Sequence, residues 1–242
     1  FAEAGFDVLS LANNHARDFG EEGRTATMQA LDALGITHSG RIGDIASWRH
    51  NDYTIAMIAF APNPGSYDIN NITEAVSEVA TLAASHDIVL VSFHGGAEGV
   101  DALHVTFDTE FYYGEKRGNV VEFSRRVIDA GADLVIGHGP HVPRGLELYR
   151  DRLIAYSLGN FNTYQGISIQ GIKGLAPILK LRMDETGAFL DGRIISTRQS
   201  RPGGPKIDPA NEAALLIKRL SEEDFGKQAP RISANGVLSR PE

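Results

Sequence analysis

The first part of the chain alternates between short apolar runs and longer segments in which apolar residues recur three and four positions apart. The first pattern predicts buried strands and the second predicts amphipathic helices. The expected strands are 6–12, 53–60, 88–93 and 134–136, and the expected helices are 21–34, 72–85 and 119–130. Gly35 and Gly131 follow two of these helices, as expected for a residue just past a helix end. This alternation predicts an α/β sheet with right-handed crossovers.

After His141 the pattern changes to strands without intervening helices. The expected strands are 145–149, 153–157, 176–183 and 189–199. The two longest of these predict an antiparallel hairpin, the stretch 201–205 predicts a rigid loop, and 209–220 predicts a last helix. Residues 226–242 show little periodicity and are expected to form a C-terminal tail. We therefore expect one domain over 1–225, with two packed sheets and helices outside them.

Composition narrows the classes of function. The chain has 242 residues, of which 42% are hydrophobic, enough for a sizeable core. A formal net charge of -8 argues against a large basic groove, and so against nucleic acid as a partner. There is no cysteine, so any metal site must use nitrogen and oxygen ligands. The longest apolar runs, such as 55–61, are far shorter than the roughly 20 residues of a membrane span.

Histidines gather where the expected strands end. His15 follows the first strand, His94 follows the third, and His138 and His141 follow the fourth, so that half of the eight histidines lie at such positions. Parallel strands present reactive side chains at their carboxyl ends, and neutral imidazoles bind Zn, Fe or Mn. A single histidine is more often a hydrogen-bonded surface or core residue. The repeated placement nevertheless predicts a site for divalent metal ions.

Four segments together resemble the CapA family, which is associated with poly-γ-glutamate capsule synthesis and belongs to the calcineurin-like metallophosphoesterase superfamily. They are 12–20 with Asn-Asn-His, 94–98, 131–141 and 154–161. The resemblance implies a four-layer α/β/β/α metallophosphoesterase-like sandwich with two divalent metal ions, Mn, Fe or Zn, between loops at the sheet edges. It also implies an opening strand with carboxylate ligands, which we expect to precede Phe1 in the natural chain.

The resemblance assigns roles to five residues. It makes Asn14 a metal ligand and His15 the catalytic residue that donates a proton. His94 and His138 bind one metal, and His141 binds the other. If the ions bind as implied, replacing His141 lowers both turnover and metal content, whereas replacing His15 lowers turnover and leaves metal content nearly intact.

Four further residues have two interpretations each. Asp18 either orients His15 or caps the helix that begins near residue 21. Glu98 and Asn160 either face the substrate or are turn residues. Arg144 either anchors an anion through its guanidinium or is a solvated loop residue. The family usually has aromatic residues where this chain has Gly95 and Gly99, which predicts a different pocket wall.

The function implied by the resemblance is a metal-dependent hydrolase, phosphoesterase-like, in capsule or poly-γ-glutamate biosynthesis. Two alternatives stay open: a non-catalytic, metal-dependent binder of an anionic polymer such as poly-γ-glutamate, and a metal-dependent hydrolase of γ-linked amide bonds. The expected partners are an anionic polymer or phosphoester substrate and an envelope polymer-synthesis machinery. Family association places the protein at the cell envelope, outside the cytoplasm.

Overall fold

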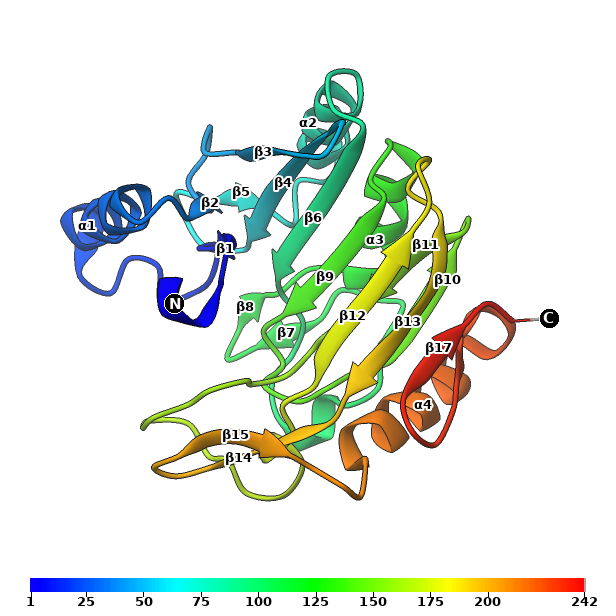
Figure 1. The fold of residues 1–242 in the computed structure, drawn as a ribbon. Helices are drawn as coiled ribbons and strands as arrows, with labels where there is room; N and C mark the ends of the chain where they lie inside the picture. Colours follow the sequence, from blue (N-terminus) through cyan, green and yellow to red (C-terminus); the bar gives the residue numbers. More distant parts are fainter. Residues whose placement is uncertain (242) are drawn as a thin grey trace.

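A seven-stranded mixed sheet forms the centre of the protein, whose computed structural model describes residues 1–241 (Figure 1). The strand order is β10-β11-β9-β6-β4-β3, and β5 pairs with β4. The strands are β3 (Ala46–His50), β4 (Tyr53–Ala61), β5 (Tyr67–Asp68), β6 (Ile88–His94), β9 (Leu134–His138), β10 (Leu146–Tyr149) and β11 (Arg152–Ala155). The inner strands β4, β6, β9 and β11 are parallel, whereas β3 and β10 join the edges antiparallel. The predicted α/β class is confirmed.

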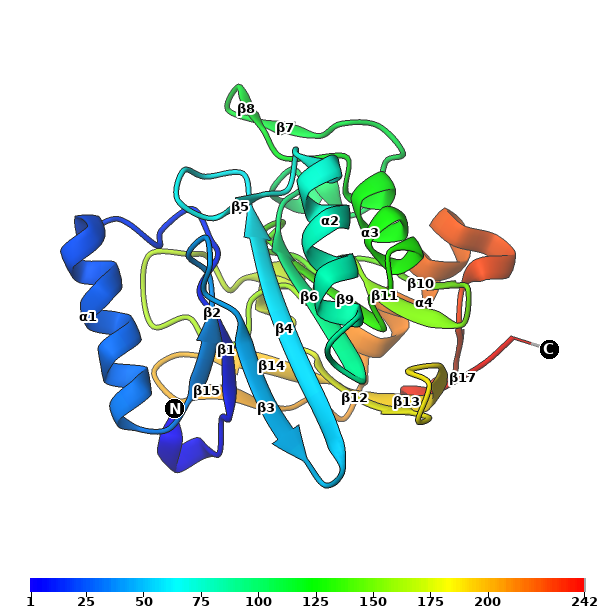
Figure 2. The same ribbon diagram turned by 90° about the horizontal axis from the view of Figure 1, so that it is seen from above.

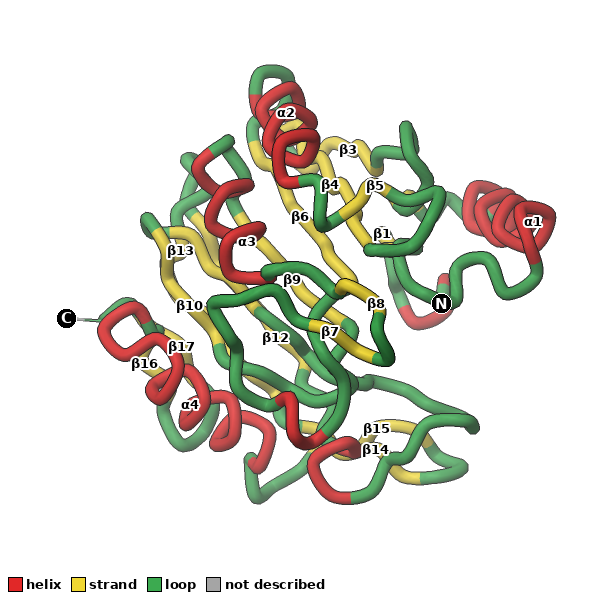
Figure 3. The backbone as a smooth tube through the Cα atoms, turned by 180° about the vertical axis from the view of Figure 1, so that it is seen from behind, coloured by secondary structure: helices red, strands yellow, loops and turns green. Residues whose placement is uncertain are grey.

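Two helices cover one face of this sheet, α2 (Ile72–Ala83) and α3 (Val120–Asp129), as the view from behind shows (Figure 3). Each begins at an asparagine, Asn71 or Asn119, whose side chain accepts a hydrogen bond from a backbone N–H in the first turn. Beneath the helices, Phe60, Phe93 and Phe123 pack edge to face. This layer fixes the sheet strands whose ends carry the candidate site.

A second sheet packs on the opposite face (Figure 2). It has the order β12-β13-β17-β16, with β12 (Ile178–Met183), β13 (Phe189–Ile195), β16 (Arg231–Ile232) and β17 (Val237–Ser239). Leu134, Leu146 and Leu153 of the first sheet share a buried cluster with Phe189 and Leu238 of the second. Helix α4 (Glu212–Phe225) contacts β10, β13 and β16, so it packs beside both sheets. The predicted hairpin of the two longest strands is β12–β13.

Two expectations for the C-terminal part differ from the structure. Residues 226–242 were expected to form a tail, but η4 (Gly226–Gln228), β16 and β17 lie there, and Ile232 and Leu238 are buried in the core. Strands this short show no periodicity, and only the pairing of β17 with β13 and of β16 with β17 identifies them. The expected strand 189–199 splits into β13 and β14 (Thr197–Ser200). β14 pairs with β15 (Gly204–Ile207) around the predicted rigid loop.

The N-terminal segment stands beside the main sheet. β1 (Val8–Ser10), shorter than predicted, pairs in parallel with β2 (Thr37–Ser39), which the sequence pattern did not indicate, and α1 (Gly20–Ala33) lies outside this pair (Figure 1). Ala12, just after β1, is buried against Ala59 and Ala61 at the end of β4. This small apolar contact brings the Asn-Asn-His loop to the carboxyl edge of the main sheet.

Short elements complete the same edge. They are η2 (Val100–Ala102), η3 (Gly171–Gly174) and the hairpin of β7 (Phe111–Tyr112) and β8 (Glu115–Lys116). The first element, η1 (Ala2–Ala4), precedes β1 and lies at the amino end of that strand. No helix within residues 1–241 is long and apolar enough to cross a membrane.

A close backbone approach at this edge predicts a stability effect. Gly139 has a φ of +124°, and a Cβ built on it would lie 2.4 Å from the carbonyl oxygen of Gly95. We expect Gly139→Ala to lower the free energy of unfolding by roughly 2 to 4 kcal/mol, because strain and a backbone clash add. Gly43→Ala, at a φ of +83° with open space around it, should cost only about 1 kcal/mol. Urea unfolding of both variants tests this, and equal losses would contradict it.

Candidate functional site

Two neighbouring strands end in histidines at the same level of the sheet. His94 closes β6 and His138 closes β9, and the two are register partners across the parallel pair. Just beyond them, the N–H of Gly95 donates to the carbonyl oxygen of His138 over 2.8 Å. The predicted convergence of these two side chains therefore follows from the register of β6 and β9.

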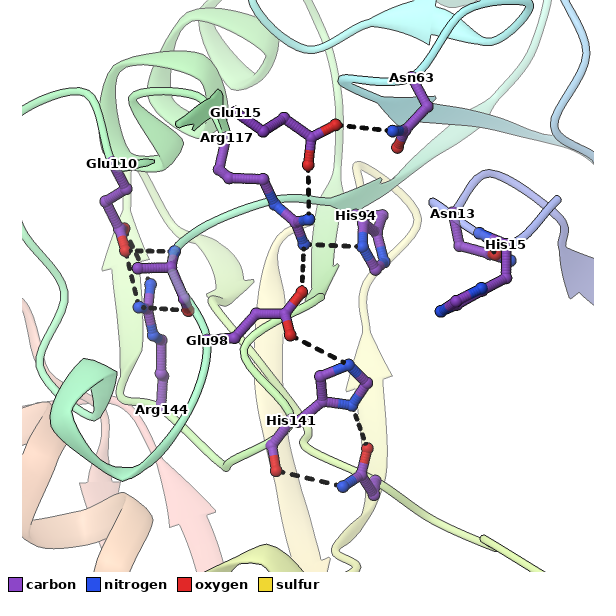
Figure 4. Close-up of polar contacts among 12 residues, drawn as sticks. Asn13, His15, Asn63, His94, Glu98, Glu110, Glu115, Arg117, His141 and Arg144 are labelled. Atoms are coloured by element: carbon purple, nitrogen blue, oxygen red, sulfur yellow. Dashed lines mark hydrogen bonds and ion pairs between the residues drawn. The ribbon is translucent and has the colours of Figure 1, made fainter. Parts of the chain in front are cut away.

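His94 is buried and lies beside a guanidinium. Its Nε2 is 2.8 Å from Nη2 of Arg117, as Figure 4 shows. Burial, then the positive charge of Arg117 and then the nearby His138, His141 and His15 together lower the pKa of His94 from its ordinary value of 6.5 to about 3. Since arginine only donates, Nε2 accepts this bond and the proton of the neutral ring is on Nδ1.

Burial also lowers the pKa of His138, from 6.5 to about 4. Two adjacent strand ends therefore present neutral imidazoles at neutral pH. A neutral ring is the form in which histidine binds a metal ion or accepts a proton.

His141 reaches the site from a strained turn. Its backbone has a φ of +59°, a left-handed conformation that is unusual for a residue with a side chain. Asn160 holds the residue twice: its Oδ1 accepts from Nδ1 of His141 over 2.6 Å, and its Nδ2 donates to the carbonyl oxygen of His141 over 3.2 Å. Nε2 of His141 thereby faces Glu98, 3.7 Å from its Oε2. Asn160 thus orients the imidazole, as outer partners of metal-binding histidines do.

The Asn-Asn-His loop supplies the fourth histidine. The N–H of His15 donates to Oδ1 of Asn13, and Nδ1 of His15 is 2.8 Å from Oδ2 of Asp18. The cap position of α1 is Phe19 and has no side-chain cap bond, so the contact of Asp18 corresponds to its orienting role. His15 is 67% exposed. In Figure 4 its ring points toward the space beside His94 and His141.

The loops that carry His15 and His141 line an open cavity of about 310 Å³, whereas His94 and His138 do not line it. Its lining includes Asn14, His15, Glu98, Tyr112, His141 and Lys173. Four of these were predicted from the sequence, whereas Tyr112 and Lys173 were not. Tyr112 comes from the β7–β8 hairpin and Lys173 from η3, segments that carry no motif and reach the cavity only through the fold.

Arg144 is fully buried and lies beside this cavity rather than in its lining (Figure 4). Its guanidinium donates to both carboxylate oxygens of Glu110, over 2.9 and 2.7 Å, and to the carbonyl oxygens of Ala97 and Ala102. These bonds tie the loop after β6 to the turn after His141. The interpretation of Arg144 as a solvated loop residue is therefore wrong, because its side chain is fully buried. Its contact with a substrate anion stays a prediction, and in this arrangement its donors bond inside the protein.

The sequence did not indicate a role for Arg117. Its side chain is 1% exposed and contacts His94, Glu98 and Glu115. No spacing or apolar run marks it, and only its contact with His94 identifies it. Within residues 1–241, no three His, Asp or Glu side chains are arranged to hold a metal ion. As arranged, the residues that we expected to bind metal are not such a group. His94 contacts Arg117 instead, and metal binding by these residues stays a prediction.

Comparison with known proteins links these loops to one family. The family model described as bacterial capsule synthesis protein PGA_cap matches residues 1–165, about two thirds of the chain, including all four predicted histidines.

Individual proteins are also similar to this chain. The PGA biosynthesis protein CapA of Bacillus subtilis is 29% identical over 239 residues, covering 91% of this chain and 58% of the relative. The capsule biosynthesis protein CapA of Bacillus anthracis is 29% identical over 184 residues, covering 68% and 42%. An uncharacterized protein of Sinorhizobium fredii is 63% identical over 227 residues, covering 65% and 49%. The chain thus spans about half the length of these relatives.

The lowered pKa values predict an acid-sensitive fold. Between pH 6.5 and about 4, His94 and His138 bind protons in the unfolded chain but stay neutral in the folded chain. The free energy of unfolding therefore falls as pH falls. Urea unfolding of metal-free protein should show this slope, and His138→Gln should flatten it. His50→Gln, at an exposed histidine, is the control. An unchanged slope in His138→Gln would refute the assignment.

Proposed function

This chain belongs to the CapA family, matched as the bacterial capsule synthesis protein PGA_cap, and we propose that it acts in poly-γ-glutamate capsule biosynthesis through a metal-dependent, hydrolase-type site. The observation that supports the proposal most is the meeting of three loops at one cavity. His15 comes from the loop after β1, Glu98 from the loop after β6, and His141 from the loop after β9. Sites that assemble from strand-end loops are typical of α/β enzymes.

The chemistry of the chain's own side chains is positioning and proton transfer. His15, held by Asp18, is exposed to the cavity and is the proposed proton donor to a leaving group. His141 is fixed by Asn160 with Nε2 toward the cavity. Divalent ions, when bound, supply a nucleophile and neutralise developing charge. Because the described residues do not form a metal shell, we derive no step through the ions.

The second candidate is a non-catalytic, metal-dependent binder of an anionic polymer. It is favoured by Lys173, a cation in the cavity lining. The protein carries a net charge of -8, so binding of a polyanion would depend on such local cations or on added metal. A hydrolase of γ-linked amide bonds is the third candidate, and it uses the same residues on a carbonyl substrate.

The names of the relatives also suggest a place of action. Capsule synthesis occurs at the cell envelope, and we propose that this protein works there, on the extracytoplasmic side, with a polymer-synthesis machinery as its partner.

Turnover and metal content of single variants test the catalytic assignment. Hydrolysis of an aryl phosphodiester and release of glutamate from poly-γ-glutamate are measured with added Mn. We expect His15→Ala to lower turnover by about 10²- to 10⁴-fold, the usual contribution of a general acid, while metal content stays near that of the wild type. His141→Ala should lower both quantities. His86→Ala, which lies outside the site and contacts Ser47 and Ser85, is the control.

The substrates separate the candidates. Phosphodiester hydrolysis favours a phosphoesterase, glutamate release favours an amide hydrolase, and polymer binding without turnover favours the binder. Equal metal loss in His15→Ala and His141→Ala would assign His15 to metal binding instead of proton donation.

A further inference from the structure

Arg117 is a buried cation at the point where the predicted metal ligands meet. Its Nη2 is 2.8 Å from Nε2 of His94 and 3.1 Å from Oε1 of Glu98, and its Nη1 is 2.9 Å from Oε2 of Glu115 (Figure 4). The same Glu98 carboxylate faces Nε2 of His141 through its other oxygen. One nitrogen of the guanidinium therefore lies between an imidazole and a carboxylate that come from different parts of β6 and its loop.

The contacts of Nη2 with His94 and Glu98 resemble those of a divalent metal ion. The lone pair of His94 Nε2 and an oxygen of Glu98 both point at Nη2, and neutral imidazole with carboxylate is a common ligand pair for Zn and Mn. A guanidinium has only donors and keeps its charge at physiological pH. A metal ion at this point would overlap the guanidinium of Arg117 and would be repelled by its positive charge. The two cations therefore exclude each other.

We propose that Arg117 occupies the cation position between His94 and Glu98, so that these two residues bind metal only when its guanidinium moves away. The proposal rests on the metal dependence proposed above, and it makes Arg117 a positioning residue that competes with the ion. In the arrangement described here, His94 is thus a partner of Arg117 and not a ligand.

The contacts of Arg117 indicate how its guanidinium could give way to a metal ion. Its backbone is fixed, since its N–H donates to the carbonyl oxygen of Glu110 and its own carbonyl accepts from Gly96. Its side chain is held less completely, because the buried Nε has no hydrogen-bond partner among the described residues. A buried donor without a partner costs free energy, which lowers the cost of moving the guanidinium. Glu115, which accepts from Asn63, is the partner that holds its other end.

Zinc binding without substrate tests the proposal. Titration calorimetry with zinc chloride alone compares the wild type, Arg117→Met, His94→Ala and the double variant. We expect Arg117→Met to bind zinc at least about tenfold more tightly, the size expected when a like charge a few ångströms away is removed. That gain should vanish in the double variant. His94→Ala alone should bind as the wild type does.

Arg144→Met is the matched control, because Arg144 is equally buried and paired with a glutamate but has no imidazole partner. It should leave zinc affinity unchanged, and Arg117→Lys, which keeps the charge, should not show the gain. No gain in Arg117→Met, or a loss in His94→Ala equal to that gain, overturns the proposal.

Because Arg117→Met removes a buried ion pair, circular dichroism checks its fold, and a second test uses the wild type. In ¹⁵N NMR, the first equivalent of zinc should leave His94 Nε2 unshifted, and a shift there overturns the proposal. Turnover is measured separately. A gain in zinc affinity without any hydrolysis would refute the hydrolase proposal and leave this inference standing.

Discussion

The parallel register of β6 and β9 is what the candidate site depends on. It places His94 opposite His138 at the ends of two buried strands, and the bond from Gly95 to the carbonyl oxygen of His138 fixes the loops that follow. A shift of one residue would turn these side chains to the other face of the sheet. The glycines beyond the two histidines permit the close backbone approach, since a Cβ on Gly139 would overlap Gly95.

Burial at this edge decides the electrostatics of the site. It keeps His94 and His138 neutral, and the charge of Arg117 adds to the effect on His94. Glu98 then joins the two halves of the site, because one of its oxygens pairs with Arg117 and the other faces His141. One buried guanidinium, that of Arg117, thus pairs with two carboxylates beside several imidazoles. An added cation must compete with it.

The two sheets give this edge its rigidity. Helices α2 and α3 cover one face of the central sheet, and β12 and β13 pack on the other, so β6 and β9 are enclosed by apolar side chains on both sides. Parallel strands buried in this way read as continuous apolar runs, which is why 88–93 and 134–136 were predictable. The last short strands were not, because Ile232 and Leu238 are isolated apolar positions whose burial depends on the pairing of β17 with β13 and of β16 with β17.

Local sequence was sufficient for the α/β alternation and for the placement of His15, His94, His138 and His141 at strand ends, because hydrophobic periodicity and glycine punctuation act over a few residues. The role of Arg117 could come only from the folded chain. Its contacts with His94 and Glu98 join segments about twenty residues apart. The residues next to Arg117 in the sequence indicate neither its burial nor its ion-pair partners. Tertiary packing alone decides which charges share a buried site, because the strength of each pairing depends on the exclusion of water by the surrounding fold.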